Sequence, residues 1–343
     1  MCRYIIIPIV LLMTLQVVAA QQPTAFELLD KYAATQDKLQ SFIVKGKSSS
    51  DIHCSYSSPQ YKPYSGRKRK FVSYEFRYDG NRFYWCRQMW GNLRFAHEFI
   101  PKDKPHYKSV LWDGAVYYNY AKAPYIRSGP GSLDIDSSRD PASVKKTIPY
   151  IPYICAPMFG FFDKERIDSV LLQAETISVR DKLEPVRRSK CYVIDAVARS
   201  GKYRIWLDTN HGYNIAKAEI RRVENDIFGD DRMAKGHTAL TSLRNVRFEK
   251  ISNIWIPMEA DVQQANNLPN GDFSRVKTHF KRIEFILNPD HDTLGTFLPR
   301  DVEDGAKIMR LNNARVKGHT WQDGNAVDEN GCKVDYKQVT PKK

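Results

Sequence analysis

The clearest pattern in the chain is an alternation of apolar and polar residues between Cys191 and Arg222. Three runs rich in Tyr, Val, Ile and Trp are separated by Ser200-Gly201 and by Asn210-His211-Gly212, residue types that accept the positive φ of tight turns. The apolar positions of the first two runs are Tyr192, Ile194, Ala196 and Ala198, then Tyr203, Ile205 and Leu207. Because alternate residues of a strand share a face, this segment is predicted to be an antiparallel meander with one apolar face that something must cover.

Runs of the same kind lie on both sides of this meander. They are residues 42–44, 71–78, 82–87, 92–99, 109–112, 116–120, 176–180, 240–250, 254–263 and 274–287. Asp79-Gly80, Asp113-Gly114 and Asn270-Gly271 between them are hairpin signals, and Gly91-Asn92 predicts a further turn. The chain is therefore predicted to be mainly β, with an antiparallel sheet.

Two positions predict irregularities in this sheet. In the run 274–287 the apolar phase changes between Phe280 and Ile283, which predicts a β-bulge that bends the strand. Pro257 has no N–H to donate to a ladder, so it is expected at an edge or a bulge.

Helical spacing appears in two short segments. Residues 23–40 begin with Thr24 and have Glu27 three positions later, the arrangement of a capping box, followed by apolar residues at helical spacing. This predicted helix either packs on the sheet for stability alone or acts as a plug over a concave face. A second short helix is predicted between Asp163 and Gln173.

Two long stretches break the β pattern. Residues 47–70 are polar, contain several Ser and Pro residues and end in Arg67-Lys68-Arg69-Lys70, so an exposed loop is predicted. Residues 121–162 are rich in proline, and long connections of this kind are either functional flaps or disordered. Their last part, 148–162, is apolar and aromatic, so it either lines a ligand cavity or packs as a buried loop.

The N-terminus has the layout of a secretory signal. Arg3 precedes an apolar run of about 15 residues, fewer than the roughly 20 needed to span a bilayer, and Ala19-Ala20 supplies small residues for cleavage. We therefore expect residues 1–20 to be removed and the protein to be periplasmic or secreted. The five remaining cysteines are Cys54, Cys86, Cys155, Cys191 and Cys332. Export permits disulfides, and Cys54 with Cys86 is the preferred pair.

Charge and motifs narrow the function. The formal net charge of +14 favours anionic surfaces such as phospholipid headgroups, unless the basic residues serve only solubility. No HExxH, GxSxG, P-loop or GxGxxG occurs, so no catalytic residue, metal site or cofactor is predicted. The alternation of aromatic and basic residues in 82–87 can stack bases, but in an exported protein a core face of rings and a solvent face of arginine is preferred, and no nucleic acid is expected.

The segment Ser109–Tyr120, a strand, an Asp-Gly turn and a strand with an aromatic finish, resembles the LolA/LolB-like family of bacterial lipoprotein carriers and receptors. Tyr203–Asp208, Lys217–Ile220 and Phe248–Pro257 are similar to later strands of relatives that sort outer-membrane lipoproteins. The similarity spans residues 24–290. It implies an incomplete β-barrel whose concave apolar face is closed by helices and receives acyl chains.

The chain departs from this family in length and in one motif. Residues 47–70 and 121–162 are insertions into the half-barrel domain of residues 21–290, and residues 291–343 form an extension with short hairpins. The Lys-Arg-Pro that places an arginine in the carriers' cavity is absent, and Arg82 stands at about that point.

The first hypothesis is a non-catalytic protein that binds lipid or an acylated lipoprotein in an apolar trough, with an anionic membrane surface as a further partner. The predicted ligand-binding residues are Arg82, Tyr84, Trp112, Tyr118, Tyr153, Met158, Phe159, Phe161, Ile205, Ile256 and Met258. Two alternatives stay open: a cell-envelope binding or scaffold module with a filled core, and a secreted hydrolase of an acidic polymer, which needs two carboxylates facing each other across a cleft.

Overall fold

The computed structural model describes residues 22–92, 99–123, 129–140, 144, 156–162, 165–229 and 231–336. The predicted signal segment and the candidate residue Tyr153 lie outside these ranges. Within them, no helix has both the length and the apolar character needed to cross a bilayer.

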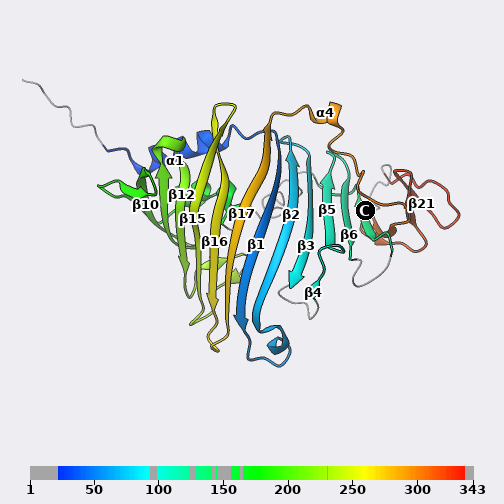
Figure 1. Cartoon of the computed structure of the whole chain (residues 1–343), viewed down its shortest axis with the longest axis horizontal. Helices are drawn as coiled ribbons and strands as arrows, with labels where there is room; N and C mark the ends of the chain where they lie inside the picture. Colours follow the sequence, from blue (N-terminus) through cyan, green and yellow to red (C-terminus); the bar gives the residue numbers. More distant parts are fainter. Residues whose placement is uncertain are drawn as a thin grey trace, which may run out of the picture.

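The predicted mainly β fold is confirmed, since most of the described chain forms one broad curved sheet that does not close into a barrel (Figure 1). In hydrogen-bonded order, its main strands are β8 (Thr176–Val179) and β9 (Glu184–Val186) beside β10 (Ser189–Ala198), then β11 (Gly201–Asp208), β12 (Asn214–Arg222), β15 (Thr238–Ile251), β16 (Ile254–Asn267), β17 (Phe273–Leu287), β1 (Phe42–Ser55), β2 (Gly66–Tyr78), β3 (Phe83–Asn92), β5 (His106–Trp112), β6 (Tyr117–Lys122), β7 (Ser132–Asp136) and β18 (Lys307–Leu311). Neighbours in this order are antiparallel except β7 and β18, which run parallel. The meander predicted for residues 191–222 is β10, β11 and β12.

The N-terminal strands β1 to β7 and the later strands β8 to β17 meet where β1 pairs with β17. This pairing runs from Phe42 opposite Leu287 to Ser55 opposite Phe273. The register shifts once, between Lys45 and Gly46, and leaves Ile283 without a partner on β1. This is the predicted bulge, and the extra residue is 58% exposed because it points away from the core.

Two further expectations about the strands have different outcomes. Pro257 is opposite Phe248 at a register shift and lies beyond the end of the β16–β17 ladder, as its missing N–H requires. The turn predicted at Gly91-Asn92 is wrong, because both residues belong to β3 and pair with the short strand β4 (Phe99–Ile100). Gly91 has the positive φ that the sequence signal indicates, +93°, but within a strand.

The exposed loop predicted for residues 47–70 is also wrong. Most of this segment forms the long ends of β1 and β2, joined through the short helix η1 (Lys62–Tyr64). Ser48 and Ser50 are buried on β1, because pairing with both β2 and β17 satisfies the backbone of a stretch with weak strand propensity.

The preferred disulfide between Cys54 and Cys86 is wrong as well, and both residues are free thiols. Cys54 on β1 is opposite Gly66 of β2, and Cys86 on β3 is opposite Glu75 of the same strand β2. At about 3.3 Å per residue these positions lie roughly 30 Å apart along the strand, far beyond the reach of a disulfide.

Helices cover one face of the sheet, called here the inner face. Helix α1 (Ala25–Gln36) begins with the predicted capping box: the Thr24 amide donates to Glu27 Oε2 at 2.7 Å, and the Glu27 amide donates to Thr24 Oγ1 at 3.2 Å. Together with α3 (Ile167–Leu172) and η3 (Ala156–Phe159), it packs on what we call the helix-side cluster. Members of this cluster include Leu28, Leu29, Tyr32, Val44, Phe76, Trp85, Val110, Met158, Ile167, Ile205, Ala218, Ile256 and Phe285.

The C-terminal extension covers the opposite, outer face near β3, β5, β6 and β7. It contains α4 (His291–Leu294), β18, β19 (Ala314–Arg315) and a hairpin of β20 (Thr320–Gln322) and β21 (Asn325–Val327). Its contacts form the extension-side cluster, whose members include Tyr84, Leu111, Tyr118, Leu133, Ile135, Phe297, Ile308 and Trp321. The two coverings lie at different ends of the sheet, with α1 beside β10 and β12 and the extension beside β6 (Figure 1).

Candidate functional site

The predicted ligand-binding residues are divided between the two faces. Those on the helix side are Trp112, Met158, Phe159, Ile205, Ile256 and Met258. Phe159 is half-buried and stacks on Phe42 with ring centroids 5.5 Å apart. Phe161 is half-buried and forms an isolated bridge with Arg166. The helix side therefore brings together six of the residues predicted to line a trough.

Tyr84 and Tyr118 are placed elsewhere. Both belong to the extension-side cluster, because Tyr84 lies one position from Phe83 and Trp85, which face inward. The division predicted for residues 82–87, rings in the core and arginine in water, is therefore wrong: aromatic rings are buried on both faces of β3.

Arg82 does not enter the trough. It lies in the turn before β3, where its Nε is 2.7 Å from Asp79 Oδ2 and its Nη1 is 2.7 Å from Asp292 Oδ1. Its guanidinium lies 4.6 Å from the centroid of Phe297. Asp79 thus holds this arginine in its own turn and Asp292 binds it to the extension, so the position expected from the carriers is not the equivalent site.

One small space lies beneath the helices. The space between α1, η3 and the strands is about 10 Å³, with Tyr32, Met158 and Phe248 among the residues around it. At Gly160 a side chain would overlap the hydroxyl of Tyr32, which indicates how closely η3 approaches α1. Ligand cavities are typically hundreds of Å³ in volume, so this particular space has no room for an acyl chain.

A band of basic side chains lies on the inner face next to this apolar region. Arg87 on β3 is directly opposite Lys108 on β5, and His106 lies two positions before Lys108 on the same face. Directly opposed residues have Cβ atoms about 5 Å apart. Arg87 also shares its face with Trp85, whose ring centroid lies 5.1 Å from the guanidinium.

Nothing in the described chain neutralises this basic pair. Neither Arg87 nor Lys108 has a carboxylate within ion-pair distance among the residues described, and Arg87 Nε is buried without a hydrogen-bond partner. Asp134 on β7 acts on Lys108 only from a greater distance. An anion bound at this band would supply the negative charge that the described residues do not place beside Arg87 and Lys108.

The electrostatics of the band agree with its geometry. Burial lowers the pKa of Arg87, and burial followed by repulsion from Arg87 lowers the pKa of Lys108. The pKa of His106 is lowered by burial first and then by Arg87 and Lys108. Like charges held together in a partly buried site disfavour one another. Sequence reasoning missed this band, although the even spacing of Phe83, Trp85 and Arg87 was a signal that one arginine shares the face of the rings.

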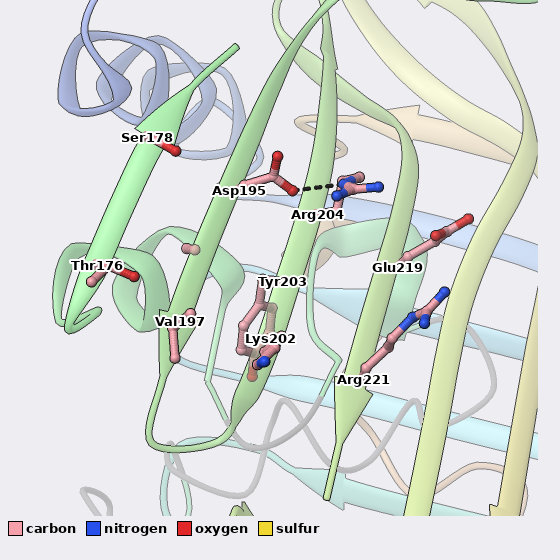
Figure 2. A pocket seen from close by; sticks show the side chains of 10 residues that line it. Thr176, Ser178, Asp195, Val197, Lys202, Tyr203, Arg204, Glu219 and Arg221 are labelled. Atoms are coloured by element: carbon pink, nitrogen blue, oxygen red, sulfur yellow. Dashed lines mark hydrogen bonds and ion pairs between the residues drawn. The ribbon is translucent and has the colours of Figure 1, made fainter.

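The outer face of the meander carries a polar groove of about 430 Å³ (Figure 2). Asp195, Arg204 and Glu219 form one row across β10, β11 and β12. Asp195 points toward Arg204, whose Nε lies 2.6 Å from Asp195 Oδ1, while Glu219 pairs with Arg244 at 3.0 Å.

This groove contains two carboxylates, Asp195 and Glu219, of the kind that the hydrolase alternative requires. Arg204 stands between Asp195 and Glu219, so the carboxylates do not face each other across an open cleft. Burial raises the pKa of Asp195, but hydrogen bonds from Arg204 and Arg180 outweigh it and hold the pKa below its usual value. A general acid needs the opposite shift. In the described ranges no three His, Cys, Asp or Glu residues gather as a metal site.

Comparisons with known proteins add little to this description. No protein family matches the sequence, and no curated protein matches it. A chain of the MucA/MucB complex of Pseudomonas aeruginosa overlays with a TM-score of 0.23 and 8% identity, covering 76% of this chain and 99% of that chain. MucB in complex with MucA(peri) gives a TM-score of 0.21 and 8% identity, covering 74% and 92%.

The ywiB protein from Bacillus subtilis gives a TM-score of 0.16 and 6% identity, covering 72% of this chain and 96% of that chain. Overlays at this level carry no argument about family or function.

Proposed function

We propose that this chain is an exported, non-catalytic binding module that takes an anionic ligand on the inner face of its sheet. The observation that carries the proposal is the pair Arg87 and Lys108, two partly buried cations in direct opposition without a carboxylate partner in the described chain. A stable domain gains nothing from holding like charges together, whereas a bound phosphate or carboxylate turns the repulsion into attraction.

The position of the band supports an amphiphilic ligand, in line with the resemblance to lipoprotein carriers. The next inward-facing pair along the same strands is Trp85 opposite Val110, and both belong to the helix-side cluster. An anionic headgroup on the band would thus have apolar surface beside it. An acyl chain would enter only if η3 and α3 moved from their places, with each buried CH₂ contributing about 0.8 kcal/mol.

The alternative of a module with a filled core has an observation of its own. The space that Tyr32, Met158 and Phe248 enclose under the helices is only about 10 Å³, which supports binding of an anionic headgroup or acidic partner without a chain entering there. Both versions use the same basic pair and differ in whether the ligand must carry an acyl chain. Catalysis is part of neither.

The test is a titration of delipidated protein with dansyl-undecanoic acid, with its methyl ester and with glycerophosphate. The lipid version predicts saturable binding of the acid and weak binding of the uncharged ester. The filled-core version predicts binding of glycerophosphate, binding of the acid no tighter than that of glycerophosphate, and no binding of the ester. In both, Arg87→Gln with Lys108→Gln weakens binding of the charged probe at least about tenfold, the factor that 1.4 kcal/mol represents.

The matched control removes the same charge from the outer face. Lys202 and Arg221 are exposed beside the outer groove, and their double change to Gln should leave binding unchanged. If both double variants bind like the wild type, or if the control weakens binding as much as the inner pair does, the band is not the ligand site. Equal affinity for acid and ester would place the ligand on apolar surface alone and would also overturn the proposal.

A further inference from the structure

A second unpartnered arginine lies on the inner face, far from the basic band in strand order. Arg222 at the end of β12 is only 1% exposed. Its Nε donates to the Ser200 carbonyl at 2.9 Å, and its guanidinium lies 4.9 Å from the centroid of Phe228. Both terminal nitrogens, Nη1 and Nη2, are buried without a hydrogen-bond partner.

This arrangement is unfavourable as it stands. Arginine remains protonated in proteins, so the two nitrogens bring donors and charge into the interior with nothing to accept them. A buried charge without a partner costs far more than an exposed one, and replacing it with an apolar residue of similar volume often stabilises a protein. A purely structural role for Arg222 would require an acceptor, and the described chain offers only the one carbonyl at Nε.

A small cavity lies beside Ser200, whose carbonyl accepts from Arg222, although Arg222 itself does not line it. It is about 150 Å³ in volume and is lined by Ala198, Arg199 and Ser200 of the β10–β11 turn, by Ile227 and Gly229, and by Glu165, Val170 and Gln173. Ser200 accepts from Arg222, and Phe228 lies between Ile227 and Gly229. Arg199 adds a second positive side chain to the wall, while Glu165 contributes a carboxylate.

Part of the cover over Arg222 comes from a short hairpin. It is the hairpin of β13 (Ile227–Phe228) and β14 (Asp231–Arg232), which pairs through two residue pairs and forms a sheet of its own. The Ile227 amide donates to the Arg199 carbonyl at 2.8 Å, and Phe228 is 40% exposed. For a ligand in the cavity to reach Nη1 and Nη2, this ring would have to move, since it lies against the guanidinium.

We infer that Arg222 is an anion site in which an oxyanion group, phosphate or carboxylate, bonds to Nη1 and Nη2 beneath the β13–β14 hairpin. The planar fork of the guanidinium matches two oxygens of either group. The cavity volume limits the ligand to a small anion or to the anionic end of a larger molecule. This site is independent of the Arg87–Lys108 band.

The experiment measures thermal unfolding of the full chain in sodium chloride, phosphate and acetate at equal ionic strength, for the wild type and for Arg222→Met. The wild type should gain about 3 °C in Tm, saturably, with phosphate or acetate. Arg222→Met should unfold at an equal or higher temperature in chloride and show no anion response. Which anion acts distinguishes phosphate from carboxylate ligands.

Arg221→Met is the matched control, since Arg221 is the exposed neighbour on the other face. It should respond to anions as the wild type does. A lower Tm for Arg222→Met in chloride together with an unchanged anion response would overturn the inference, as would loss of the response in Arg221→Met. Should Arg222→Met fail to fold, guanidinium NMR of the wild type decides: the Arg222 Nη signals must shift with phosphate or acetate, and unchanged signals refute the site.

Discussion

Two arginines on the inner face lie in one row across the sheet but differ in the residues around them. Arg282 on β17 and Arg87 on β3 belong to one cross-strand row, which passes through Gly46 and Tyr74. Arg282 is 2% exposed, donates from Nη1 to the Pro257 carbonyl at 2.7 Å, and lies 4.1 Å from the ring centroid of Phe159. Arg87 is half-buried, has the ring of Trp85 beside it and is directly opposite another cation, Lys108.

The difference teaches that residue type and burial do not separate a structural arginine from a functional one. Arg282 lies under η3, where the Pro257 carbonyl accepts from its Nη1 and the rings of Phe159 and Phe285 lie against its guanidinium, so we assign it to the fold. Arg87 lies where the helix cover ends, opposite another cation. The interactions that Arg87 lacks are those that a ligand can supply, and the following changes test this division.

The largest effect is expected for Arg282→Met. The change leaves the Pro257 carbonyl buried without its donor and removes the charge from the faces of Phe159 and Phe285. Loss of such a buried charged hydrogen bond should lower the free energy of unfolding by about 3 kcal/mol. Urea denaturation measures it, and a change below about 1 kcal/mol would mean that Arg282 is not the structural member of the pair.

Gly46→Ala should have the next largest effect. A Cβ at this position would overlap the Tyr74 hydroxyl and lie 2.8 Å from the Lys281 carbonyl, so both ring and backbone must move. We expect a loss of about 2 kcal/mol in unfolding free energy, the usual range for overpacking. Binding at the Arg87–Lys108 band should persist in this variant. If the variant lost ligand binding as well as stability, packing around Gly46 and the band at Arg87 would not be independent.

Arg87→Met should have the smallest effect on stability. Because the change removes a partly buried cation that faces Lys108, the free energy of unfolding should stay within about 0.5 kcal/mol or rise. Urea denaturation beside Arg282→Met makes the comparison direct. A loss as large as that of Arg282→Met would mean that Arg87 has stabilising contacts of its own and is not reserved for a ligand.

The features predicted correctly from the sequence are those set by neighbouring residues. The Thr24 and Glu27 capping box, the Asp113-Gly114 hairpin and the bulge at Ile283 each depend on a few adjacent positions, and the structure has all three. The serine-rich part of β1 was misread as loop, because its strand form depends on β2 and β17, which are distant in sequence.

The site was harder to predict for the same reason. Arg82 was chosen by its place in a family pattern, but Asp292 of the C-terminal extension, 210 residues away, pairs with it. Arg87 was read as a solvent-facing residue, although its parity with Phe83 and Trp85 places it inward. That Lys108 stands opposite Arg87 follows from strand register, which the sequence alone does not fix.

The measurement that tests the central claim most directly is an NMR titration of His106. Burial, Arg87 and Lys108 together should hold its pKa below the ordinary value of 6.5. Above 6.5 the imidazole is neutral in both folded and unfolded chains, so His106 has no effect on stability there. The free energy of unfolding falls as pH drops from 6.5 to the folded pKa, and the loss is retained at lower pH. We predict a depressed pKa in the wild type that rises when Arg87 and Lys108 are changed to Gln. A wild-type pKa of 6.5 or higher, or one that the double change does not raise, would contradict an uncompensated positive band.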